Sequence, residues 1–305
     1  MDSITELWQR IDTWLQTFAP ARAARLGPGA TPEELAEVEA ALGLTLPGDF
    51  KASYCIHNGA WGGDYLLMGF PDFYPLSQIL SLGKMFHALH QKPGWPGKEP
   101  YFLSDPARRS LPVQPVWHHP QWVAFAGDGG GFQWCIDLAP TPDGTRGQVI
   151  AYDHEEGPAD LLFPRFEALL SIYADQLEAG FYLGHSPILR LKEVRYLQQR
   201  RASFQEPSPA KPVLHQAIKS AWERDIDKSL DTFGQVLQLE TATPEDRFLA
   251  FYGLITWCTI EWGHQDEVPA LFAQLEAEAQ RMEASHWVHE EVTLLKPWPV
   301  RSLKS

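Results

Sequence analysis

The sequence predicts an α+β region followed by an all-helical region, and three observations indicate this order. Capped amphipathic helices stand near the start of the chain. A glycine-rich turn at residues 127–131 then separates two segments in which apolar and polar residues alternate. Near the end, two helical segments resemble each other at an offset of 39 residues, from Ile226 to Gln265.

Four helices are expected in the first ninety residues. Ser3 begins a capping box with the glutamate three residues on, so a helix starts there. A second helix spans residues 31–43, because Thr31 is a good N-cap, proline follows it, and a glycine can end the last turn. A third, short helix is expected to open at Pro47 and to run through Tyr54 before it stops at Asn58-Gly59, and a fourth is expected near residues 77–90.

The glycine-rich turn predicts a β-hairpin formed by residues 122–126 and 132–138, with one face buried. The Asp128 carboxylate in this turn is expected to accept hydrogen bonds from nearby amides. Residues 148–152 form the next predicted strand. Apolar residues at helical spacing over residues 166–180 then predict a long closing helix.

The last third of the chain is predicted to be helical. Residues 186–201 have the composition of a basic helix, and a proline-rich linker continues to residue 212. Beyond it, residues 226–233 align with residues 265–272, a pattern that resembles a pair of tetratricopeptide-type repeats. The expected domains are an α+β domain at 1–185, the basic helix and linker at 186–212, and a helical-hairpin domain at 213–305.

Charge restricts the class of partner. The chain has 25 basic and 39 acidic residues, a formal net charge of −14, and most of the excess lies before residue 185. Such a balance argues against nucleic acid, whose binding needs cations, and favours basic partners. Three widely spaced cysteines and the lack of a long apolar run predict a cytoplasmic protein that neither inserts into a membrane nor forms disulfides.

No residue pattern predicts an enzyme, a metal site or a cofactor. The glycine-rich turn has Phe132 where a dinucleotide-binding loop needs its third glycine, and a strand follows it instead of a helix. His118-His119 and His154 lack the spacing of a metal site and are expected on the surface. Cys55 and Cys135 are expected to be buried thiols and not nucleophiles.

Two acidic groups of residues are the candidates for partner binding. The first combines aromatics with carboxylates, as interface hot spots do, and the second is expected on the loop between the last strand and the closing helix. Together with the turn aspartate, the candidates are Trp61, Asp64, Tyr65, Asp72, Asp128, Asp153, Glu155, Glu156 and Asp160.

A series of separated landmarks takes the interpretation further. They include the capped helix at residues 30–43, the segments Leu46-Pro-Gly-Asp-Phe50 and Ile56-His-Asn-Gly59, and the hairpin at residues 122–138. In this order they resemble the SUKH superfamily, which includes a fungal cell-wall assembly regulator and bacterial immunity proteins of toxin systems. The resemblance covers roughly residues 3–182 and implies a compact α+β fold with a mixed sheet and no catalytic activity.

The resemblance leads to two hypotheses about function. In the first, the chain is a bacterial immunity protein that binds and neutralises a cognate toxin, possibly a basic one such as a nuclease. In the second, it is a regulatory scaffold whose helical repeats hold a partner. The sequence does not identify the toxin, the domain that would bind it, or the oligomeric state.

Overall fold

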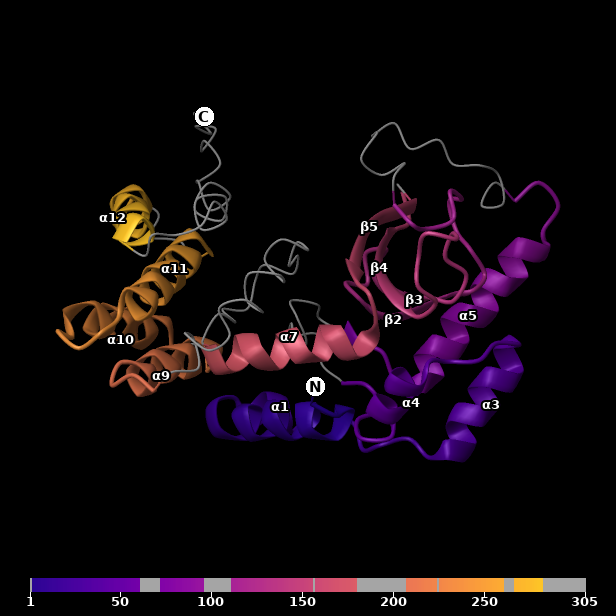
Figure 1. The fold of residues 1–305 in the computed structure, drawn as a ribbon, viewed down its shortest axis with the longest axis horizontal. Helices are drawn as coiled ribbons and strands as arrows, with labels where there is room; N and C mark the ends of the chain where they lie inside the picture. Colours follow the sequence, from indigo (N-terminus) through magenta and orange to yellow (C-terminus); the bar gives the residue numbers. More distant parts are fainter. Residues whose placement is uncertain are drawn as a thin grey trace. The chain divides into compact units, whose positions relative to one another are not determined.

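A computed structural model describes seven stretches of the chain, with gaps between them, and Figure 1 shows their arrangement as a ribbon. The described residues are 2–60, 72–95, 111–155, 157–179, 207–223, 225–260 and 266–281. They fall into two compact units. The first unit takes residues up to 174 apart from 16–19, and the second takes 16–19 and the described residues from 175 onward.

One antiparallel sheet forms the centre of the first unit. Its five strands lie side by side in chain order: β1 (Asp72–Phe73), β2 (Trp122–Gly127), β3 (Phe132–Asp137), β4 (Gln148–Asp153) and β5 (Gly157–Phe163). The α+β class is confirmed. The pairings are all antiparallel, however, where the resemblance implied a mixed sheet, because tight hairpins connect β2 to β5 in sequence.

Helices pack against this sheet and bury it on both sides. They are α1 (Ile4–Phe18), α2 (Pro20–Ala23), α3 (Pro32–Leu42), α4 (Gly48–Tyr54), α5 (Leu76–Gln91) and α7 (Phe166–Ala179). Aromatic rings of α4, β2 and α7 meet in the core, where Phe50 lies 5.9 Å from Phe125 and 5.1 Å from Phe166. On the other side α5 lies along β2 (Figure 1). The hairpin is therefore buried on both faces and not on one.

The predicted helix caps are confirmed. At α1, the Ser3 amide donates to Glu6 while the Glu6 amide donates to the Ser3 hydroxyl. At α3, Thr31 and Glu34 form the same reciprocal pair, and Gly43 ends the helix with a φ of 65°. These local pairs satisfy amides that a helix start leaves free, which is why the sequence reveals them.

Strand β5 corrects a prediction. Residues 157–163 were expected to be a loop, since glycine, proline and aspartate at its start are turn residues. Gly157 does make the turn, with a φ of 74°, but the residues after it pair with β4. Two irregularities in the β4–β5 register accommodate the proline.

Four helices make up most of the described second unit. They are α9 (Lys211–Trp222), α10 (Ile226–Gln238), α11 (Pro244–Ile260) and α12 (Val268–Arg281), and each packs against the next, while α11 also contacts α9. Phe233 and Phe272 are both buried at equivalent places of the predicted repeat. The helical character is confirmed, and the tetratricopeptide identity stays a prediction. The predicted basic helix lies outside the described residues.

Candidate functional site

Four predicted site residues lie at one end of the sheet. Asp72 begins β1 and pairs with Gly127 at the end of β2, next to Asp128. Asp153 ends β4 and pairs with Phe132 at the start of β3, and Glu155 follows two residues later. Because neighbouring strands run antiparallel, these chain positions meet at the same sheet end. We call Asp72, Asp128, Asp153 and Glu155 the acidic end.

Tight turns fix the carboxylates of the acidic end. An Asp128 carboxylate oxygen accepts from the Gly130 amide at 2.7 Å and from the Phe132 amide at 3.1 Å, as the sequence predicted. An Asp153 carboxylate oxygen accepts from the Glu155 amide at 2.7 Å. The second oxygen of Asp128 is left for other partners, since no contact to it is seen among the described residues.

The two turns are also tied to each other. The His154 amide donates to the Gly131 carbonyl at 3.1 Å. Gly131 has a φ of 113°, and a Cβ at this position would collide with the His154 ring. Glycine is thus required where the β2–β3 turn approaches the β4–β5 turn.

The other predicted site residues are placed differently. Asp160 lies on β5 opposite Ala151 and not on a loop, because residues 157–163 extend the sheet. Trp61, Asp64, Tyr65 and Glu156 lie outside the described residues, so the aromatic anchor patch stays a prediction.

Tyr74 belongs to the acidic end, although the sequence analysis did not select it. Its side chain is 3% exposed, and its hydroxyl lies over Gly127, where any Cβ would collide with it. Burial raises the pKa of Tyr74 to about 12, and the nearby Asp72, Cys135 and Asp128 add to the rise. The phenol is therefore a neutral hydroxyl among carboxylates.

The opposite end of the sheet is also built around an aspartate, but this one is buried. Asp137 accepts from the Trp122 indole at 3.1 Å, from the Gln148 side-chain amide at 2.9 Å and from the Ala139 amide at 2.9 Å. Burial raises the pKa of Asp137, and these three hydrogen bonds partly offset the rise. We call Trp122, Asp137 and Gln148 the closed end.

A buried imidazole pair corrects the prediction of a surface position for His118, whereas His154 is exposed as predicted. His118 is 3% exposed, and its Nδ1 lies 3.1 Å from His90 Nε2. Its ring stacks on Phe86, with ring centroids 3.7 Å apart. Burial, aided by the neighbouring His90 and His119, lowers the pKa of His118 to about 3. The His118 ring is thus neutral at ordinary pH, in an aromatic layer over the sheet.

Two of the three cysteine thiols are buried and one is exposed. Cys135 and Cys258 are buried as predicted, and burial raises the pKa of both, that of Cys258 to about 11. Cys55 was also expected to be buried, yet it is exposed, because α4 ends at Tyr54 and Cys55 forms its C-cap. High thiol pKa values disfavour thiolate chemistry at the two buried positions.

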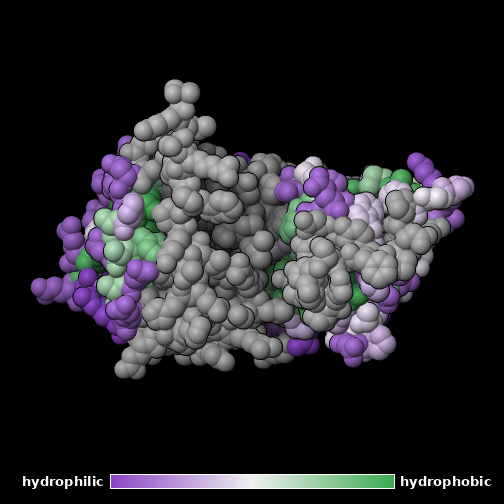
Figure 2. Space-filling model, turned by 90° about the horizontal axis from the view of Figure 1, so that it is seen from above, coloured by the Kyte–Doolittle hydropathy of each residue, from purple (hydrophilic) through white to green (hydrophobic). Residues whose placement is uncertain are grey.

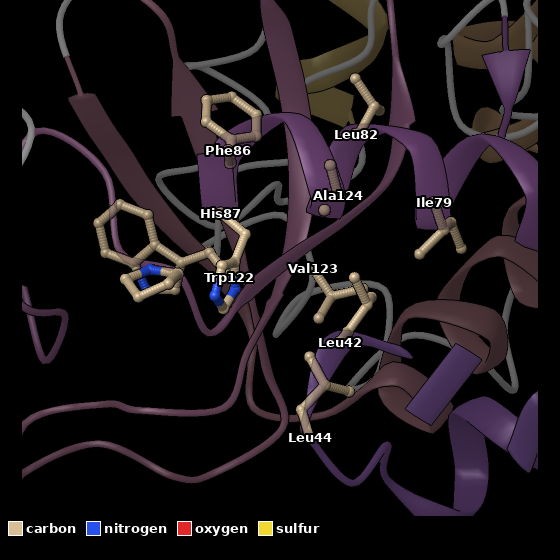
Figure 3. A pocket seen from close by; sticks show the side chains of 11 residues that line it. Leu42, Leu44, Ile79, Leu82, Phe86, His87, Trp122, Val123 and Ala124 are labelled. Atoms are coloured by element: carbon tan, nitrogen blue, oxygen red, sulfur yellow. The ribbon is translucent and has the colours of Figure 1, made fainter. Parts of the chain in front are cut away.

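A shallow apolar hollow lies between α3, α5 and β2. Figure 3 shows side chains from the three segments, among them Leu42, Ile79 and Val123, turned towards one another. The space between them has room for about a water molecule or two and not for a substrate. The hollow is a packing seam of the fold.

The described surface is dominated by polar groups. Figure 2 shows hydrophilic side chains beside small hydrophobic areas on the face that it presents. Met85, which is 46% exposed, is the large hydrophobic side chain that stands out among the described residues.

The described stretches show neither a cluster of metal ligands nor a membrane-spanning helix. They contain no group of three or more histidine, cysteine or carboxylate side chains that could hold a metal ion. No helix there is long and apolar enough to cross a membrane.

The arrangement defines an α+β domain with a single antiparallel sheet, one closed end and one acidic end. Residues 29–172 match the SMI1 / KNR4 family (SUKH-1), and this part of the chain is a SUKH-1 domain. The resemblance drawn from the sequence landmarks is thereby confirmed.

Curated relatives are fungal proteins named as regulators. The chain is 24% identical to the glucan synthesis regulatory protein of Neurospora crassa, over 67% of this chain and 43% of the relative. It is 29% identical to the cell wall biosynthesis/cell cycle regulator smi1 of Schizosaccharomyces pombe, over 59% and 37%. It is 25% identical to the cell wall assembly regulator SMI1 of Saccharomyces cerevisiae, over 57% and 40%. The chain spans about two fifths of the length of these relatives.

Proposed function

We propose that this chain is a non-catalytic regulatory binding protein, acting in the cytoplasm, whose acidic end docks onto a basic surface of a partner protein. The observation that carries the proposal is the acidic end itself. Its four carboxylates come from the start of β1 and from the β2–β3 and β4–β5 turns, all at the same end of the sheet. The Glu155 side chain is 80% exposed. Positioned charge of one sign steers a partner of the opposite sign and fixes its register.

The relatives support regulation over neutralisation of a toxin. The three relatives described above are named as regulators of glucan synthesis or of cell-wall biosynthesis or assembly, which favours the scaffold hypothesis. Regulation through binding needs no reaction centre. It is consistent with the burial of Cys135, Cys258 and His118.

The helical unit is proposed as a second binding surface. Stacked helical hairpins present a surface that can hold a peptide, and α9 to α12 pack in such a sequence. A scaffold of this kind would use the SUKH-1 domain for one partner and the helices for another.

The test is recovery of a partner by the tagged full chain. The Asp153→Asn/Glu155→Lys variant keeps an acceptor in the turn but removes most local charge. It should lose the partner at physiological salt. The matched control is Glu33→Gln/Glu37→Lys, which makes the same charge change on the exposed face of α3. Equal recovery by both variants would contradict docking through the acidic end.

Neutralisation of a toxin is a second candidate, and the charge of the first region favours it. Before residue 185 there are 22 acidic and 11 basic residues, which suits a basic toxin such as a nuclease. Co-expression with a toxin encoded by a neighbouring gene tests it. Protection of the cell that disappears in the Asp153→Asn/Glu155→Lys variant would support it, and unchanged toxicity with the wild-type chain would exclude it.

A further inference from the structure

A buried carboxylate joins the segment before α9 to the start of α11 in the helical unit. The Ser208 hydroxyl donates to an Asp246 carboxylate oxygen at 2.5 Å, and the Thr243 amide donates to the same oxygen at 3.0 Å. The Asp246 amide in turn donates to the Thr243 hydroxyl at 3.1 Å. Asp246 is 2% exposed, so these donors replace water that burial removes from its carboxylate.

Ser208 also shapes the first turn of α9. Its hydroxyl oxygen accepts from the Ala210 amide at 3.2 Å, and its carbonyl accepts from the Lys211 amide at 3.1 Å. Helices α9 and α11 contact each other. A single hydroxyl thus serves as an acceptor within its own segment and as a donor to α11. A chemical change at this oxygen would affect both elements.

The sequence around Ser208 has the pattern that proline-directed protein kinases select. These kinases phosphorylate serine or threonine before a proline, whose nitrogen carries no hydrogen that needs a partner, and many favour a basic residue three positions on. Ser208 has Pro209 and Lys211 at these positions, and no other serine or threonine of the chain has both features. The residues that precede a proline are Thr31, Thr141, Ser186, Ser208 and Thr243.

The surroundings of Ser208 give access to an enzyme. Pro207 and Pro209 are exposed on either side of it, and Ser208 itself is partly exposed. A kinase needs the hydroxyl to leave Asp246 before transfer. Opening of a hydrogen bond at the end of an element requires much less free energy than unfolding of the whole chain. Phosphorylation would therefore trap the open arrangement.

We propose that Ser208 is phosphorylated by a proline-directed protein kinase and that the phosphate opens the contact between the start of α9 and the start of α11. Ser208 Oγ forms a bond to the γ-phosphorus of Mg-ATP, and the bond from this phosphorus to the bridging oxygen of ADP breaks. The hydroxyl proton passes to a base of the kinase. The product carries about two negative charges at pH 7 and has no hydroxyl to donate to Asp246. Repulsion between the phosphate and the Asp246 carboxylate then opens the contact.

Helix α9 itself should persist in the phosphorylated chain. A phosphate just before the first turn of a helix interacts favourably with the free amides there. The change is thus confined to the contact with α11, which distinguishes it from general unfolding.

The first test is phosphorylation of the full chain by a cyclin-dependent kinase with Mg-ATP, followed by mass spectrometry of the peptides. Ser208 should be the main site, and Pro209→Ala should reduce its phosphorylation about tenfold or more, a factor equal to about 1.4 kcal/mol. The matched control is Pro142→Ala, which makes the same change after Thr141 and should leave Ser208 phosphorylation as it was. No phosphate on Ser208, or equal phosphate in the Pro209→Ala variant, would overturn the proposal.

The second test is amide hydrogen exchange of the phosphorylated chain. The amides of residues 243–247 should exchange about tenfold faster than in the unmodified chain, whereas those of α9 should change little. Asp246→Asn keeps an acceptor oxygen for Ser208 but removes the charge. In this variant, phosphorylation should accelerate exchange by less than about threefold, because the repulsion is absent. Exchange that phosphate does not change, or accelerates equally in both chains, would overturn the proposal.

Neither test involves a partner of the chain. The outcome is therefore independent of docking through the acidic end, and failure of one proposal leaves the other as it stands.

Discussion

The two ends of the sheet use the same residue type in opposite ways. At the closed end, the Asp137 carboxylate is fully buried and accepts from Trp122, Gln148 and Ala139, so its hydrogen-bonding capacity serves the fold. At the acidic end, the Asp128 carboxylate accepts from the Gly130 and Phe132 amides and that of Asp153 from the Glu155 amide, so these contacts shape turns and do not join strands.

The difference shows where this domain keeps interaction capacity. A buried aspartate joins strands, and its loss leaves donors without partners. Asp128, by contrast, is exposed and lies in a turn at the sheet end, where its carboxylate can meet another molecule. Carboxylates of the acidic end should therefore matter for binding, and that of the closed end for stability.

Removal of the closed-end carboxylate should have the largest effect on stability. Asp137→Ala removes three hydrogen bonds, two of them buried, and should lower the free energy of unfolding by about 2–4 kcal/mol. Urea denaturation measures this loss. The matched variant Asp128→Ala should lose about 1 kcal/mol or less, because the exposed carboxylate accepts only from turn amides that water can also reach. Equal losses of stability in the two variants would contradict the proposed difference between the closed end and the acidic end.

Acid should destabilise the chain through the imidazole pair over the sheet. The folded pKa of His118 is lowered to about 3, whereas an unfolded histidine titrates near 6.5. The stabilising contribution is thus complete above pH 6.5 and is lost as the pH falls. Uptake of one extra proton on unfolding changes the free energy of unfolding by about 1.4 kcal/mol per pH unit. When this free energy is measured by denaturation between pH 7 and pH 5, it should fall less steeply in His118→Asn than in the wild type.

His57 should act with the opposite sign. Burial alone would lower its pKa, but hydrogen bonds to Asp12 and to the Gly27 carbonyl outweigh burial and raise the pKa. Both partners only accept hydrogen bonds, so the doubly protonated ring fits the site best. Its contribution is present below pH 6.5 and is lost as the pH rises through the raised pKa. His57→Gln should flatten the stability profile above pH 6.5, and an unchanged profile would contradict this.

Glycine substitutions at the acidic end should have moderate effects. Gly131→Ala combines a φ of 113° with a collision against His154, and should lower the free energy of unfolding by about 2 kcal/mol. Gly129→Ala is the control, since Gly129 has a φ of 71° and no atom nearby. It should lose about 1 kcal/mol. Thermal denaturation measures the loss of stability in both variants. A larger loss at Gly129 than at Gly131 would contradict the close contact between the β2–β3 and β4–β5 turns.

Local features of the fold were predictable from the sequence. The capping pairs of Ser3 and Thr31 and the amide contacts of Asp128 depend on residues within four positions, so spacing alone reveals them. Strand β5 was missed because its pairing with β4 overrides the turn propensity of its first residues.

Features that depend on distant contacts were less predictable. The burial of His118 depends on α5, which brings His90 and Phe86 against it from about thirty residues away in sequence. Tyr74 could have been found only from its alternation with Asp72 and the glycine opposite, which required the strand register. The sequence also did not show that four of the selected acidic residues share one sheet end.

The most direct test of the central claim is photo-crosslinking at the two ends of the sheet. A photoreactive amino acid replaces Glu155 at the acidic end or the exposed Gln121, next to Trp122 of the closed end, in otherwise unchanged full chains. Docking through the acidic end predicts a crosslinked partner from position 155 and none from position 121. Crosslinking from position 121 alone, or equally from both, would contradict the account.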